Sequence, residues 1–190
     1  MYLGVYEEYK QAKEAASGSL DLDAYHSNFD VAIELDLIAD EQEEESRREQ
    51  LLKMRREALS LMSILSKFEP RLIGSVWRVT ARRGSDIDIV VYSSDLNAVQ
   101  SELSSSGLRI KSITDGVAQE DGRMRITQHI KVTLNYEFEA EIVVRPAEDR
   151  EVIERCDIYG DLKKGLKLID LEKLMKADPL RRFVPERRLR

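Results

Sequence analysis

The sequence lacks the features of three well-defined classes of protein. A single cysteine, Cys156, among 190 residues excludes an internal disulfide framework and any zinc site built from cysteines. No stretch reaches the roughly 18 consecutive apolar residues that a membrane-spanning helix needs. The first residues also lack the basic segment and apolar run of a signal peptide. We therefore expect a cytoplasmic protein that does not contact a membrane.

The chain also has no excess of positive charge. Its net charge is −6 and its pI is about 5.2, which argues against a protein that coats nucleic acid on its own. Hydrophobic residues make up 42% and charged residues 35%, a composition typical of a folded globular protein with a highly charged surface. The length suits one domain of moderate size, with or without an extension.

The most informative stretch runs from residue 74 to residue 91, where a turn, a short helix and a strand are expected. Asp86 and Asp88 begin that strand and share one face, roughly 7 Å apart. Two carboxylates so close raise each other's pKa unless a cation neutralises them, and Mg²⁺ suits such oxygen ligands. Upstream, Gly74-Ser75 offers a flexible turn, a hydroxyl and backbone N–H groups for an anion. A phosphate site beside a metal site indicates phosphoryl or nucleotidyl transfer.

This stretch resembles the signature of the DNA polymerase β-like nucleotidyltransferase superfamily, and of its small minimal nucleotidyltransferases in particular. The signature is a hydrophobic residue, Gly-Ser, a short spacer and an Asp-hydrophobic-Asp-hydrophobic run. Trp77 and Val79 depart from it, because alanine and glycine are usual at these two positions. The positions in register are Ile73, Gly74, Ser75, Arg78, Thr80, Ala81, Ser85, Asp86, Ile87 and Asp88.

The resemblance implies a fold, a metal site and a nucleotide site. The fold is α/β, of the α+β kind: a mixed, mostly antiparallel sheet flanked by helices, with an N-terminal helical extension. Two Mg²⁺ ions would be held by Asp86, Asp88 and a third carboxylate on a neighbouring strand. Glu141 fits that third position better than Glu139, since aliphatic residues follow it. The implied nucleotide-binding residues are Gly74, Ser75, Arg78 and Ser85.

The implied reaction is transfer of a nucleoside monophosphate from an NTP to a hydroxyl acceptor by a two-metal mechanism. An RNA end, a protein side chain and a small molecule all stay open as acceptors. The alternative function is an antitoxin-like module that binds a nucleotide or a protein partner on the same fold with little or no catalysis. The bulky Trp77 and Val79 motivate this alternative.

Hydrophobic alternation and turn residues predict the strands. On the polar face of the strand at 124–136, His129 is expected to be solvated rather than a ligand, and Lys131 is a candidate for approaching phosphates. Met124 and Ile126 belong to the apolar face of the same strand. The expected strands are 71–73, 86–92, 108–113, 124–136 and 137–145, with turns at Asp115-Gly116 and Asp121-Gly122.

A long helix is expected from the acidic run after Asp40 to Phe68-Glu69, where Pro70 disfavours helix at the preceding residue. Its apolar residues recur at helical spacing. Two interpretations are open: the apolar stripe packs on the rest of the domain, or residues 45–68 pair with residues 1–38 as a hairpin that binds a second copy or a helical partner. The stripe consists of Leu51, Met54, Ala58, Leu61, Leu65 and Phe68.

Three segments are expected along the chain. Residues 1–44 would form a helical extension, residues 45–160 the nucleotidyltransferase-like domain, and residues 161–190 a short helical and basic C-terminal segment. The basic tail from Arg181 onwards is expected to be unstructured or to pack against an acidic surface, which residues 34–49 provide.

Overall fold

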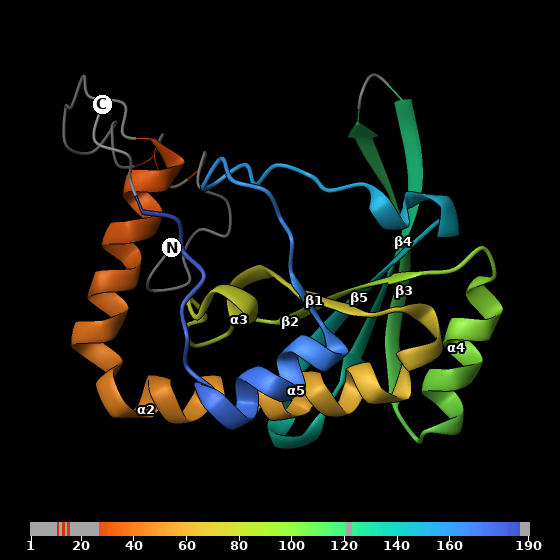
Figure 1. Cartoon of the computed structure of the whole chain (residues 1–190), viewed down its shortest axis with the longest axis horizontal. Coiled ribbons are helices and arrows are strands. Elements are labelled where there is room, and N and C mark those ends of the chain that lie inside the picture. Colours follow the sequence, from red (N-terminus) through yellow and green to blue (C-terminus); the bar gives the residue numbers. More distant parts are fainter. Residues whose placement is uncertain (1–10, 12, 14, 16–26, 121–122, 187–190) are drawn as a thin grey trace.

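A computed structural model describes residues 11, 13, 15, 27–120 and 123–186. Six strands form one sheet in the order β3-β4-β5-β2-β1-β6, and every neighbouring pair is antiparallel except β2 with β5 (Figure 1). The expected mixed, mostly antiparallel sheet flanked by helices is confirmed. The strands are β1 (Arg71–Ile73), β2 (Ile87–Tyr92), β3 (Arg109–Glu120), β4 (Arg123–Thr133), β5 (Glu139–Arg145) and β6 (Leu166–Lys167). The helices are α2 (Asn28–Ile64), α3 (Gly74–Arg78), α4 (Leu96–Ser105) and α5 (Leu168–Ala177), with 3-10 turns η1 (Ser66–Phe68), η2 (Asn135–Glu137) and η3 (Ala147–Glu151).

The two faces of the sheet have different surroundings. Helices α2, α4 and α5 lie on one face, where they bury Ile87 and Ile89 of β2 (Figure 1). Because successive side chains of a strand alternate, Asp88 of the same strand points to the opposite face. That face carries only a small apolar cluster around Val90 and Tyr92. Polar side chains of the central strands can therefore reach a cavity or solvent there.

Helix α2 begins earlier than expected. Ser27 caps it by accepting a hydrogen bond from the Asp30 N–H, and the Asp30 carboxylate accepts one from the Ser27 N–H in return. The helix ends at Ile64, earlier than the expected end at Phe68-Glu69, and the separate 3-10 turn η1 follows and stops at Phe68. Since α2 runs unbroken through residues 44 and 45, the predicted domain boundary there is not a break in secondary structure.

The apolar stripe of α2 packs in the chain's own core, which is the first of the two interpretations. All six of its side chains are buried there, so the stripe is not free to bind a second copy or another helix. A hairpin with residues 1–38 is wrong for residues 28–38, because they belong to α2 itself. At the start of the expected helical extension, the described residues 11, 13 and 15 are helical, and the other residues before 27 lie outside the described residues.

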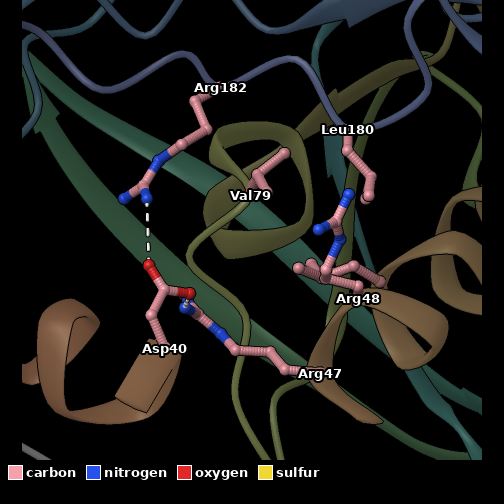
Figure 2. A pocket seen from close by; sticks show the side chains of 7 residues that line it. Asp40, Arg47, Arg48, Val79, Leu180 and Arg182 are labelled. Atoms are coloured by element: carbon pink, nitrogen blue, oxygen red, sulfur yellow. Dashed lines mark hydrogen bonds and ion pairs between the residues drawn. The ribbon is translucent and has the colours of Figure 1, made fainter. Parts of the chain in front are cut away.

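An ionic cluster connects two parts of α2 with each other and with the C-terminal segment. Along a straight helix, Asp36 and Arg47 would be about 16 Å apart, beyond the reach of their side chains. They nevertheless form an ion pair, and Figure 1 shows α2 bending between its two halves. Asp40 lies between Arg47 and Arg182 and pairs with both (Figure 2), while Arg182 also pairs with Asp36. Packing of the basic tail against the acidic segment is confirmed for Arg182.

The hairpin of β3 and β4 is longer than the sequence indicated. The turn expected at Asp115-Gly116 is wrong, because both residues lie inside β3 and pair with β4; the turn expected at Asp121-Gly122 falls outside the described residues. The hairpin extends past the helices (Figure 1), so Met124 and Ile126 are 72% and 69% exposed rather than half-buried. The alternation of polar and apolar residues predicts which face of the strand a side chain lies on, but not how much of that face the helices cover.

Arg55 fastens α2 to α3 and to the C-terminal segment. Its guanidinium is fully buried and donates to the carbonyls of Val76 and Trp77 at 3.2 and 2.7 Å. It also donates to the carbonyls of Pro179 and Arg181 at 2.6 and 3.2 Å. Burial lowers the pKa of Arg55 to about 10, against the opposing effect of Asp178, so the side chain stays charged at neutral pH.

Replacing Arg55 with Met is expected to lower the free energy of unfolding by about 2–5 kcal/mol, because the buried carbonyls lose their donor. The neighbouring exposed Arg56 provides the matched control, and Arg56→Met should change stability by less than about 0.5 kcal/mol. Urea denaturation measures both. Equal stability of the two variants would contradict a structural role for Arg55.

Candidate active site

Three carboxylates meet where β2 and β5 run side by side. The parallel register places Asp88 directly beside Glu141, and Asp86 lies two residues before Asp88, just ahead of β2. The expected strand start at Asp86 is therefore one residue early. Glu139 shares the face of Glu141 but pairs with Thr133 on β4 and accepts a hydrogen bond from Lys111. The geometry thus favours Glu141 over Glu139 as the third carboxylate.

The central carboxylate has the strongest electrostatic perturbation. Burial, together with the neighbouring Glu141 and Asp86, raises the pKa of Asp88 to about 7, although Lys131 opposes the shift. Burial also raises the pKa of Asp86, again against the effect of Lys131. Like charges gathered in a partly buried place favour either a proton or a cation. Perturbation of this kind is typical of functional sites.

Two side chains of β4 hold the flanking carboxylates. Lys131 Nζ lies 3.7 Å from Asp86 Oδ2, and His129 Nδ1 lies 3.3 Å from Glu141 Oε1. The other ring nitrogen of His129 is 3.2 Å from the hydroxyl of the buried Thr127. His129, expected to be solvated, therefore contacts the site. No local pattern of residues could indicate this contact, because it depends on the pairing of β4 with β5.

Gly116 explains how the His129 ring fits against the edge strand. A Cβ at this position would lie 2.6 Å from His129 Nε2 and 2.7 Å from Thr127 Oγ1. Only glycine leaves this space, which accounts for a residue that is unfavourable inside a strand. The glycine interpreted from sequence as a turn residue is thus part of the wall beside the third carboxylate.

The carboxylates suit a divalent cation by their chemistry. Within the described ranges, however, no group of three or more His, Cys, Asp or Glu side chains is arranged to hold a metal ion. The flanking carboxylates are instead directed to Lys131 and His129. The oxygen donors of Asp86, Asp88 and Glu141 nevertheless fit Mg²⁺, which takes one or two protein carboxylates and completes its shell with water and phosphate oxygens.

The Gly-Ser turn joins these carboxylates to a cavity of about 230 Å³. Gly74 has a φ of +67°, and a Cβ on it would overlap Asp88 Oδ2, so the turn passes directly against this carboxylate. The lining of this cavity includes all four residues implied as nucleotide-binding, together with segments of α2 and of the C-terminal region. The lining residues are Ala32, Asp36, Gly74, Ser75, Arg78, Thr80, Arg82, Ser85, Cys156, Ile158 and Tyr159.

The two departures from the motif have structural consequences. Val79 has a φ of +63°, in the left-handed region where a β-branched residue is strained, so the glycine usual at this position is readily explained. Trp77 is buried and stacks on Phe183 of the C-terminal segment, with ring centroids 6.1 Å apart. Neither residue lines the cavity beside the carboxylates. The bulky side chains therefore serve packing on the far side of the turn.

Arg78 lines the cavity, but its guanidinium is already paired. It contacts both carboxylate oxygens of Asp161, at 2.7 and 3.2 Å, and donates to the Phe183 carbonyl at 2.8 Å. It also lies over the rings of Trp77 and Tyr159, at 4.4 and 4.6 Å from their centroids. Phosphate binding by Arg78 stays a prediction that would require these contacts to change.

A second cavity, of about 400 Å³, lies between α2 and the C-terminal segment (Figure 2). Two of the three arginines in its lining, Arg47 and Arg182, are paired with Asp36 and Asp40. It contains none of the four residues implied as nucleotide-binding, whereas all four line the smaller cavity. The smaller cavity at the Gly-Ser turn is therefore the better candidate for chemistry.

Comparison with known proteins gives a partial likeness. No family model and no curated protein matches the chain. Among solved structures, the Cid1 poly(U) polymerase bound to MgGTP is 23% identical, with a TM-score of 0.33, over 50% of this chain and 32% of that one. A cytoplasmic RNA terminal U-transferase is 24% identical, with a TM-score of 0.32, over 50% of this chain and 30% of that one. The GLD-2/RNP-8 complex gives 12% identity and a TM-score of 0.34, over 53% of this chain and 42% of that one.

The matched region is thus less than half of each of these neighbours. As to membranes, none of the helices in the described ranges combines the length and the apolar character that a bilayer crossing requires.

Replacing Asp88 with Asn is expected to raise the thermal unfolding midpoint at pH 8 and to leave it nearly unchanged at pH 4. The pKa of about 7 in the folded state exceeds the value of about 3.9 for an unfolded Asp, so the folded protein binds the proton more tightly. Stability of the wild type should therefore fall as the pH rises from about 4 to about 7. Calorimetry across this range measures the difference, with Asp157→Asn at an exposed site as the control. A gain that does not vary with pH would contradict this electrostatic origin.

Proposed function

We propose that this chain transfers a nucleoside monophosphate from an NTP to a hydroxyl acceptor. The observation that carries the proposal is the position of Gly74, which lines the cavity and also touches the Asp88 carboxylate. A triphosphate bound in the cavity would place its reacting phosphate next to the three carboxylates. An NTP donor and a cytoplasmic location are part of the proposal.

The residues of the chain have distinct roles in this proposal. Gly74, Ser75 and Ser85 would bind the phosphates that leave, so that the acceptor oxygen can attack the α-phosphorus while the bond to pyrophosphate breaks. Asp86, Asp88 and Glu141 would hold two Mg²⁺ ions, which supply positive charge to the phosphate oxygens and lower the pKa of the acceptor hydroxyl when bound. Binding of Mg²⁺ would displace the proton that the carboxylates hold, since a cation relieves the same repulsion between them.

His129 and Lys131 would orient the flanking carboxylates. Each contacts one oxygen of its partner, His129 at Glu141 Oε1 and Lys131 at Asp86 Oδ2. The second oxygen of each carboxylate is then available to a cation. This arrangement uses β4 to position groups that β2 and β5 supply.

The proposal is tested by measuring the release of pyrophosphate from each of the four NTPs with Mg²⁺. Cell extract is added as a source of acceptor. Release should fall by about 100-fold or more in Asp86→Asn and in Glu141→Gln, because both remove a carboxylate that balances cationic charge at the reacting phosphate. A labelled NTP would then identify the acceptor.

Glu139→Gln is the matched control, since Glu139 is on the same face of β5 but is bonded to Lys111. It should retain most of the activity. No release by the folded wild type from any NTP, or equal loss in the variants at Glu139 and Glu141, would refute the assigned roles. Binding of an NTP without release would favour the non-catalytic module.

A further inference from the structure

The cavity at the Gly-Ser turn is lined by two arginines, whose guanidinium groups are paired to different extents. Arg78 bonds to Asp161 and to the Phe183 carbonyl and lies over two aromatic rings. Arg82, by contrast, has a buried Nη1 with no hydrogen-bond partner among the described residues. A buried donor left unpaired is costly, and native structures contain few of them.

The backbone of Arg82 is held by three hydrogen bonds. Its N–H donates to the Ser85 hydroxyl at 2.9 Å, and its carbonyl accepts from the Ser85 N–H at 2.9 Å and from Gln50 at 3.2 Å. These bonds close the loop between α3 and β2. Arg82 is itself one of the residues that line the cavity.

The anion that would pair with Arg82 does not come from the cavity wall. The carboxylate in the lining, Asp36, is already bound by Arg47 and Arg182. The remaining polar lining residues near the turn, Ser75 and Ser85, offer hydroxyl groups. A guanidinium with hydroxyl groups beside it matches the oxygens of a polyphosphate, with which arginine forms strong, often bidentate hydrogen bonds.

We propose that Arg82, rather than Arg78, is the cation that binds the triphosphate of the nucleotide. This inference rests on the proposed function and assigns a binding residue that the motif does not contain. Arg82 acts at the phosphates that leave, and the unpaired Nη1 is satisfied when they are bound.

Isothermal titration of the full chain tests this with two probes, inorganic tripolyphosphate and a non-hydrolysable NTP analogue, each with Mg²⁺. Arg82→Gln should weaken both by roughly 10- to 100-fold, the range expected for the loss of hydrogen bonds to a charged group. The matched control is Arg83→Gln, which removes the same charge from the next residue, an exposed one outside the cavity lining. Its affinities should stay within about twofold of the wild type, given the weak effect of exposed charges.

The thermal unfolding midpoint provides a second readout. Arg82→Gln should not lower it in the absence of ligand, because no hydrogen bond of the side chain is lost from Nη1, whereas a structural arginine would lower it. If the wild type binds the NTP analogue and Arg82→Gln binds it equally well, the role of Arg82 is overturned while the proposed function stands. If Arg82→Gln and Arg83→Gln weaken binding equally, only general charge is involved and the role is again overturned. If the wild type binds neither probe, the proposed function falls with it.

Discussion

The position of the Gly-Ser turn depends on one buried cation. Arg55 bonds to the carbonyls of Val76 and Trp77, in the same short helix that begins with Gly74 and Ser75. A five-residue helix has too few internal hydrogen bonds to hold itself in place. Its position is therefore fixed from outside, by a long helix on one side and by the C-terminal segment on the other. Loss of that contact would displace the turn from the carboxylates even if the sheet stayed intact.

Much of this arrangement was predictable because it is local. The Gly-Ser turn, the short helix and the strand carrying Asp88 follow one another within a few residues, and spacing alone places them. The cap of α4 is equally local, because Asp95 accepts from the backbone N–H groups of two residues that follow it closely in the chain. Local backbone sterics also agree with the end of the 3-10 turn η1 at Phe68, shortly before Pro70.

The rest depends on pairings between distant segments. The choice of Glu141 over Glu139 needs the register of β5 on β2, and the contact of His129 needs the register of β4 on β5. The roles of the arginines could not be predicted from the sequence for the same reason. Arg78 matches the motif and yet is paired with Asp161, a residue far along the chain, whereas Arg82 falls in the variable spacer and its buried Nη1 has no partner among the described residues. A motif gives residue types, but the surrounding fold decides which of them remain free to bind.

The parallel pairing of β2 with β5 also has a consequence for folding kinetics. It joins segments about 50 residues apart, so it closes a long loop, and such contacts form slowly because their entropy must be lost first. The antiparallel hairpin of β3 and β4, built from neighbouring residues, can form early and serve as a template for β5. The same late step brings Asp88 beside Glu141 and so adds the repulsion between them to the barrier at neutral pH. Assembly of the carboxylate cluster and closure of the sheet are thus a single event in the folding of this chain.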